Sequence, residues 1–207
     1  TVDSSGGHTV AVYFKDVDSG LEYIFNGESR FAIASLNKAP YAMYLYTLAE
    51  QGTISLTDTI HVTKAMLEKS KDNSGILKDD ENLPRDMSIE ELISYMLRYS
   101  DTGALRILIS RYGADGYKEY IGALGIQDPA VMSNVLGGSI AAAEAGRYLE
   151  ALHRYMETGL FGAQLKDHLM NTRNLMIRSG WPVARKYGWD EKAFHDMAVV
   201  YAEHPYY

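Results

Sequence analysis

The sequence of 207 residues contains no cysteine, which excludes disulfides, thiolate metal sites and cysteine nucleophiles. Positively charged residues are also too few for a nucleic-acid-binding protein, because phosphate contacts need clustered Lys and Arg. The sequence has 20 Lys and Arg and 27 Asp and Glu. No stretch is long and apolar enough to span a membrane. Hydrophobic residues make up 46% and charged residues 23%, the balance of an ordinary globular protein.

Metal chemistry has no support in the sequence, because the histidines show no metal-ligand spacing. They are His8, His61, His153, His168, His195 and His204. We therefore expect no metal and no cofactor. The composition says little about a small-molecule substrate, and we expect the chain to act as a monomer that binds no nucleic acid.

Strand-like runs lie at both ends of the chain, and helical spacing fills the middle. Residues 9–15 and 21–25 are β-branched and aromatic and flank turn residues, which predicts a hairpin. Residues 183–189 and 195–201 predict a second pair of strands. Helices are predicted over residues 35–51, 89–98, 102–112, 115–124, 140–158 and 160–171, with loops at 69–84, which we expect to be exposed and mobile, and at 125–138.

This order predicts an α/β fold of the α+β type. An antiparallel sheet is built from both chain ends and flanked by helices, and an all-helical lobe lies between them. We assign residues 1–52 and 165–207 to the sheet lobe and residues 53–164 to the helical lobe.

Ser35 and Lys38 form the only S-x-x-K in the chain, at the start of a predicted helix. Residues three apart share a helix face, so the amine can lie beside the hydroxyl and take its proton. The alternative is a helix-capping serine followed by a solvated lysine.

Two later sequences also carry polar groups suited to a site. Ser100 and Asp101 form the only Ser-Asp dipeptide, which is either a helix cap or the source of a hydroxyl that relays a proton. Lys186 and Gly188 form the only K-x-G, on a predicted strand. A glycine there often marks close approach of a ligand, and the lysine is either a carboxylate-binding group or an edge-strand charge.

The order and setting of these sequences resemble the S-x-x-K, S-D-N and K-T-G motifs of penicillin-recognising serine hydrolases. The segment F-A-I-A-S-L-N-K at 31–38 resembles the F-x-x-A-S-x-x-K of class A β-lactamases, and H-D-M-A-V-V at 195–200 resembles their H-D-x-A-x-V strand. The resemblance extends from about residue 9 to the end and implies a β-lactamase/transpeptidase-like fold.

By this resemblance Ser35 is the nucleophile, Lys38 its base and Ser100 the proton relay. Lys186 would hold a substrate carboxylate. The backbone N–H groups of Ser35 and Trp189, next to Gly188, would form the oxyanion hole.

Three departures from the family pattern bear on activity. Thr102 replaces the Asn of the second motif, so contact with a substrate amide is in question. Tyr187 replaces the small hydroxyl residue of the third motif, and it narrows the carboxylate site if it points into the cleft. Residues 125–138 contain no Glu to activate the deacylating water, and Asp128 is their only carboxylate.

Two functions therefore stay open. The chain is either a serine acyl-enzyme hydrolase acting on β-lactams or cell-wall-peptide-like amides with weak deacylation, or a catalytically impaired penicillin-binding or cell-wall-binding module with the same fold. The resemblance further implies a location outside the cytoplasm of a bacterium, secreted or attached to the envelope.

Overall fold

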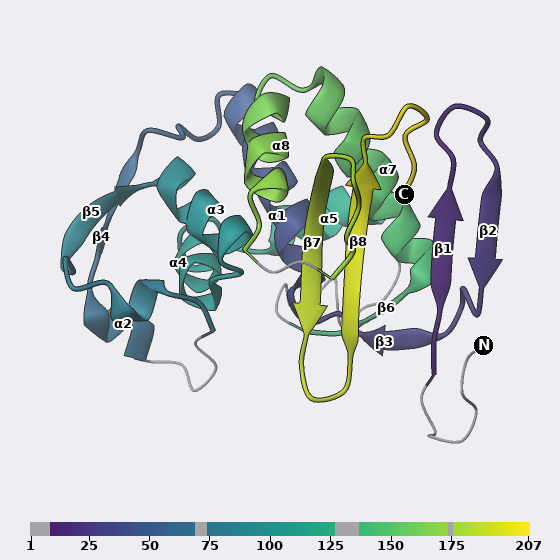
Figure 1. Cartoon of the computed structure of the whole chain (residues 1–207). Coiled ribbons are helices and arrows are strands. Elements are labelled where there is room, and N and C mark those ends of the chain that lie inside the picture. Colours follow the sequence, from purple (N-terminus) through teal and green to yellow (C-terminus); the bar gives the residue numbers. More distant parts are fainter. Residues whose placement is uncertain (1–8, 69–73, 127–136, 174–175) are drawn as a thin grey trace.

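A computed structural model describes residues 9–68, 74–126, 137–173 and 176–207 (Figure 1). Its strands are β1 (Val12–Lys15), β2 (Glu22–Phe25), β3 (Arg30–Ala32), β4 (Thr59–Val62), β5 (Arg85–Ser88), β6 (Ser139–Ala141), β7 (Val183–Trp189) and β8 (Phe194–Val200). Its α-helices are α1 (Lys38–Glu50), α2 (Lys64–Glu68), α3 (Ile89–Arg98), α4 (Thr102–Tyr112), α5 (Asp115–Ala123), α7 (Ala142–Thr158) and α8 (Gly162–Met170). Two 3-10 turns, η2 (Ala34–Asn37) and η3 (Leu77–Asp79), complete it.

Both hairpins predicted at the chain ends are confirmed. β1 pairs with β2 and β7 pairs with β8, each in antiparallel register. The two hairpins are joined through the last residues, because Tyr206 bridges Asp16 beside β1 and Val200 in β8 (Figure 1). The α/β class is therefore confirmed, with the C-terminal segment as the link between the hairpins.

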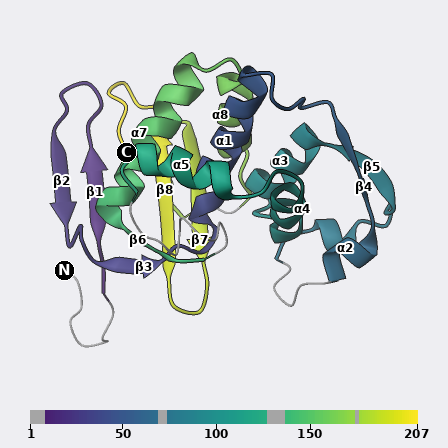
Figure 2. The same cartoon turned by 180° about the vertical axis from the view of Figure 1, so that it is seen from behind.

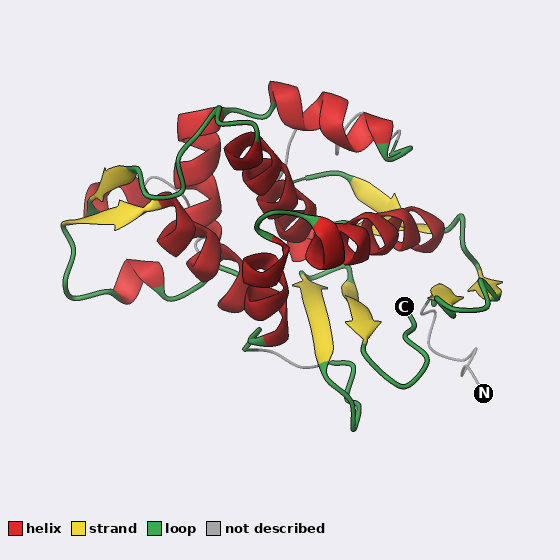
Figure 3. Ribbon diagram, turned by 90° about the horizontal axis from the view of Figure 1, so that it is seen from above, coloured by secondary structure: helices red, strands yellow, loops and turns green. Residues whose placement is uncertain are grey.

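The first long helix, α1, lies at the centre of the molecule. All of its residues from 38 to 46 are buried, so it is covered on every side, and it contacts α3, α5, α7 and α8. Seen from above, the helices gather in the middle of the molecule with the strands around them (Figure 3). Pro40 falls in the first turn, where a missing N–H breaks no helical bond. Just before the helix, buried Asn37 accepts hydrogen bonds from Tyr117 of α5 at 2.5 Å and Tyr148 of α7 at 3.0 Å. These contacts fix the start of α1 against the surrounding helices.

The prediction of an all-helical lobe was wrong in one respect. Antiparallel strands β4 and β5 form a ribbon beside α2, α3 and α4 (Figure 2). Each strand has only four residues, so the alternation of T-I-H-V is too short to stand out from the helical pattern, and R-D-M-S does not alternate. The predicted lobe boundaries remain a prediction.

Two further segments differ from the sequence prediction. Residues 139–141 form β6, which pairs with β3, so α7 begins two residues later than predicted. The prediction of an exposed loop over residues 69–84 was wrong for Leu77, which is fully buried in η3. The hydrogen bond from its N–H to Asp101 holds that turn against α4. Asp128 and most of the loop at 125–138 lie outside the described residues. No helix in the described part of the chain is long and apolar enough to cross a membrane.

Candidate active site

Ser35 lies where β3 turns into the central helix. Ala34 has a φ of 47°, the left-handed region that residues with a Cβ rarely adopt. Such a conformation costs on the order of 1–3 kcal/mol and persists only where the surroundings impose it. The turn directs the chain from strand to helix in a few residues and puts Ser35 in the first turn, where backbone N–H groups have no intrahelical acceptor.

Lys38 is buried, with 2% of its surface exposed, so the alternative of a solvated lysine was wrong. Its Nζ donates to the Ser35 hydroxyl at 3.0 Å and to the Thr102 hydroxyl at 3.0 Å. The carbonyl oxygen of Ser100 accepts at 2.5 Å, and the hydroxyl of Ser100 lies 3.3 Å away. Lys38 thus joins the S-x-x-K turn to the Ser-Asp dipeptide.

Ser100 presents both of its oxygens to Lys38 because of its backbone conformation. Its φ is 53°, again in the left-handed region, at the junction between α3 and α4. The strain of this junction is offset by the hydrogen bonds that Ser100 receives. Lys38 therefore contacts left-handed Ser100 and also Ser35, which directly follows left-handed Ala34.

Asp101 explains how the junction is held in place. Its carboxylate accepts from the N–H of Ala104 at 2.9 Å and so caps α4, as one sequence alternative predicted. The other carboxylate oxygen accepts from the N–H groups of Ile76 and Leu77, each at 2.8 Å. Ser100 beside it remains available for the site, so the cap and the site coexist in this dipeptide.

Lys186 approaches Ser100 from the opposite side of the site. It is 1% exposed, so it is not an edge-strand charge in solvent. Its Nζ donates to the Ser100 hydroxyl at 2.9 Å and to the Tyr187 carbonyl at 2.7 Å. Burial, together with the neighbouring charge of Lys38, holds the pKa of Lys186 well below its ordinary value.

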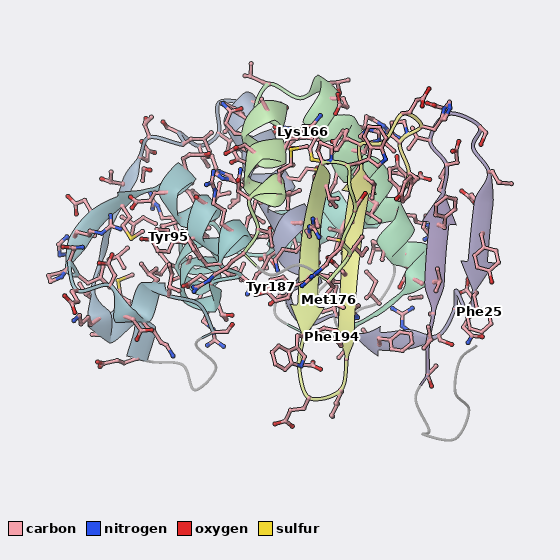
Figure 4. The ribbon with its side chains drawn as sticks, viewed as in Figure 1. Phe25, Tyr95, Lys166, Met176, Tyr187 and Phe194 are labelled. Carbon is pink, nitrogen blue, oxygen red and sulfur yellow. The ribbon has the colours of Figure 1, made fainter. Side chains whose placement is uncertain are left out.

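The ring of Tyr187 lies over this ammonium, with its centroid 4.1 Å from Nζ. Figure 4 shows Tyr187 on the side of β7 that faces α3 and α4. Of the two orientations considered from the sequence, the ring therefore adopts the one that narrows the space around Lys186.

The register of the β7–β8 hairpin fixes where the Trp189 backbone points. Tyr201 donates to Pro182, and hydrogen-bonded pairs alternate along an antiparallel ladder, so Trp189 lies in a non-bonded pair with Phe194. Its N–H is thus directed away from β8, toward the edge of β7 against which η2 packs. Its side chain is 69% exposed.

His195 was not singled out for the site from the sequence, yet it lies against two of its segments. Its Nε2 is 3.2 Å from the carbonyl oxygen of Ile33, two residues before Ser35. A Cβ on Gly188 would lie 2.6 Å from the imidazole, so any larger residue there would displace the ring or the strand. Burial holds the pKa of His195 below its ordinary value, because it disfavours the charged ring.

Ser74 is a second residue that the sequence gave no reason to choose. Its hydroxyl lies 2.7 Å from that of Thr102, and its carbonyl accepts from the Thr102 N–H at 2.8 Å. Thr102 thus connects Lys38 with the segment before η3, and a pair of hydroxyls occupies the region predicted to contact a substrate amide.

The structure brings together most of the predicted site residues, namely Ser35, Lys38, Ser100, Thr102, Lys186 and Tyr187, with Gly188 and Trp189 on the adjoining strand edge. Hydrogen bonds run without interruption from the Ser35 hydroxyl through Lys38 and Ser100 to Lys186. Such a chain can carry a proton away from a serine and return it to a leaving group. Among the described residues, no group of three His, Asp or Glu side chains could hold a metal ion.

Comparison with solved structures identifies relatives of this architecture. A β-lactamase from Sphaerobacter thermophilus superposes with a TM-score of 0.83 at 20% identity, covering 97% of this chain and 80% of that one. A mutant of PBP-A, solved as an acyl-enzyme complex with penicillin G, gives a TM-score of 0.80 at 16% identity, covering 96% of this chain and 78% of that one. These similarities establish the fold.

Sequence comparison assigns the family. An imipenem-hydrolysing β-lactamase of Enterobacter cloacae is 25% identical over 121 residues, 58% of this chain, and the match spans 40% of that protein's length. The family described as the β-lactamase enzyme family matches residues 1–207. With its fold, its buried lysines and its three motifs in order, the chain belongs to the β-lactamase enzyme family.

Proposed function

We propose that this protein is a serine acyl-transfer enzyme that opens β-lactams or cell-wall-peptide-like amides. The observation that carries the proposal is the uninterrupted chain from Ser35 through Lys38 and Ser100 to Lys186. Its curated relative is named for imipenem hydrolysis, and PBP-A was solved as an acyl-enzyme with penicillin G. Both names support the same class of substrate here.

In the acylation step the Ser35 oxygen attacks the carbonyl carbon of the amide, and Lys38 in its deprotonated form accepts the hydroxyl proton. A C–O bond forms and the C–N bond breaks. The proton leaves Ser35 over its 3.0 Å contact with Lys38, and then passes from Lys38 to the Ser100 hydroxyl, 3.3 Å away, and on to the leaving nitrogen. Lys186 holds the Ser100 hydroxyl in position for this transfer.

The oxyanion that forms in this step needs donors on the other side of the carbonyl. We assign this role to the N–H groups of Ser35 and Trp189, which belong to the packed segments η2 and β7. Preorganised donors of this kind contribute on the order of 3–4 kcal/mol each.

Hydrolysis of the acyl-enzyme is the weak step in this proposal. Water must attack the Ser35 ester while a base takes its proton, and residues 125–138 contain no Glu. Asp128 is shorter by a methylene and precedes proline. Loss of a general base slows its step by roughly 10²–10⁴-fold. The acyl-enzyme would therefore persist, as in a penicillin-binding protein.

Two features of the site also favour a second candidate function, a binding module without turnover. Thr102 in place of an amide and the Tyr187 ring over Lys186 both oppose efficient acylation. For either function we propose a location outside the cytoplasm of a bacterium, where such substrates are met. An export signal or an envelope anchor in the precursor would support this location, and a precursor with neither would contradict it.

Stopped-flow kinetics with a chromogenic cephalosporin test the function. We expect at most one equivalent of product per protein, followed by a low steady rate, and no burst in Ser35→Ala. Ser110→Ala, at an exposed position of α4, is the matched control and should behave as the wild type. A steady rate near the roughly 10 per second of ordinary enzymes would contradict weak deacylation, and a burst in Ser35→Ala would contradict the nucleophile.

A further inference from the structure

Two hydrogen-bond acceptors and one aromatic ring surround the Nζ of Lys186. One N–H is given to the Ser100 hydroxyl at 2.9 Å and a second to the Tyr187 carbonyl at 2.7 Å. The Tyr187 ring lies over the ammonium, 4.1 Å from centroid to Nζ. With 1% of its surface exposed, the lysine has no open face for a carboxylate.

Tyr187 is held in this position by its own strand. Lys186 and Tyr187 are neighbours on β7, and the carbonyl that accepts from the ammonium belongs to the residue whose ring covers it. A substrate carboxylate could reach Nζ only by displacing the ring, which would end a cation–π contact in a desolvated site. A small side chain at position 187 would leave that space empty.

We propose that Tyr187 is a specificity-determining residue that covers Lys186 and makes the site favour acyl donors without a carboxylate beside the scissile bond. The inference rests on the proposed acyl-transfer function and narrows its substrate class. Internal amides, esters and thioesters belong to this class. Amides whose leaving nitrogen is attached to a carbon that bears a carboxylate, penicillins among them, acylate Ser35 by the same step but more slowly.

Benzylpenicillin and its methyl ester form a suitable pair of probes, because they differ only in this carboxylate. Acylation of Ser35 is followed by intact-mass spectrometry in wild type, Tyr187→Thr and Tyr187→Phe. The wild type should react with the methyl ester at least as fast as with benzylpenicillin. Tyr187→Thr should shift the ratio toward benzylpenicillin by about 30-fold, the factor that corresponds to a desolvated cation–π contact.

Tyr187→Phe is the matched control, since it keeps the ring over the ammonium and removes only the phenolic hydroxyl. It should leave the ratio within about threefold of the wild type, a difference worth under 1 kcal/mol. A wild type that prefers benzylpenicillin tenfold or more would overturn the proposal, even if neither variant folds. An unchanged ratio in a folded Tyr187→Thr would also overturn it.

The two hypotheses fail in different ways. If no variant forms a Ser35 adduct with either probe, the acyl-transfer function fails and the specificity inference fails with it. If adducts form but their ratio ignores residue 187, the function stands and the specificity role of Tyr187 is wrong.

Discussion

Replacing Gly188 with alanine tests how closely β7 must approach the turn that carries Ser35. The new Cβ would lie 2.6 Å from Cδ2 of His195, 2.7 Å from its Nε2 and 3.2 Å from the carbonyl oxygen of Ile33. Carbon contacts are optimal near 3.5–4.0 Å, so the strand or the imidazole must move by roughly 1 Å.

That displacement has a predictable cost in activity. The next residue, Trp189, would supply one oxyanion donor, and an error of about 1 Å at a catalytic group can reduce the rate about 10²-fold. Loss of one oxyanion donor costs about 10²–10³-fold. We therefore expect Gly188→Ala to acylate about 10²-fold more slowly, with an overpacking cost of about 1–3 kcal/mol in the free energy of unfolding.

The assay is the acylation rate from stopped-flow kinetics, with urea denaturation in parallel. Gly180→Ala is the control, because its Cβ would meet no atom within 4 Å, and its rate should match the wild type. Adding His195→Ala to Gly188→Ala removes the two closest contacts, so the double variant should recover part of the rate, measured against His195→Ala alone. A folded Gly188→Ala with the wild-type rate would refute this reasoning.

Three further changes probe the supports of the site. Asp101→Ala removes an acceptor of three backbone N–H groups and should lower the free energy of unfolding by about 2–4 kcal/mol in urea denaturation; a loss below about 0.5 kcal/mol would contradict this. Asn37→Leu removes the acceptor of the Tyr117 and Tyr148 hydroxyls and should lower the free energy of unfolding by about 2–4 kcal/mol, measured by thermal denaturation. A variant as stable as the wild type would contradict this. The pKa of His195 is lowered, so the unfolded chain binds the extra proton and stability should fall as the pH drops below 6.5; in urea titrations His195→Gln should reduce that slope by up to about 1.4 kcal/mol per pH unit, and an equal slope would exclude His195 as its source.

Local signals in the sequence predicted much of the fold. The helix predicted over residues 89–98 is confirmed as α3, and Ser88 before it accepts from the N–H of Glu91 at 3.1 Å, the contact of a helix-capping serine. The hairpins at the chain ends follow from β-branched runs around turns. The β4–β5 ribbon was missed because its four-residue strands are specified by pairing between distant segments, which local periodicity does not encode.

The site was predictable where its chemistry is local. Ser35 and Lys38 are three residues apart, and that spacing suffices to join them. Ser74 lies far from the motif residues in the chain, so no spacing pointed to it. His195 begins the H-D-M-A-V-V sequence, but its contacts with Gly188 and Ile33 arise from strand pairing and packing, which local spacing does not encode. The left-handed backbone of Ser100 was equally hidden, because a non-glycine residue carries no sequence signal for it.

Gly188 of the K-x-G sequence is a position of close approach, as predicted, but the groups that approach it differ from those expected. A glycine in a strand was interpreted as a place where a ligand approaches the backbone. In the structure the groups that approach Gly188 are the imidazole of His195 and the carbonyl of Ile33. The glycine therefore serves the packing of β7 against the Ser35 turn.

Intact-mass spectrometry after incubation with penicillin G, followed by peptide mapping, tests the central claim most directly. The account predicts one added acyl group per chain, located on Ser35, that decays slowly after excess penicillin is removed. It also predicts no adduct in Ser35→Ala. An unmodified wild-type chain with no penicillin consumed, or an adduct mapped to any residue other than Ser35, would contradict the account.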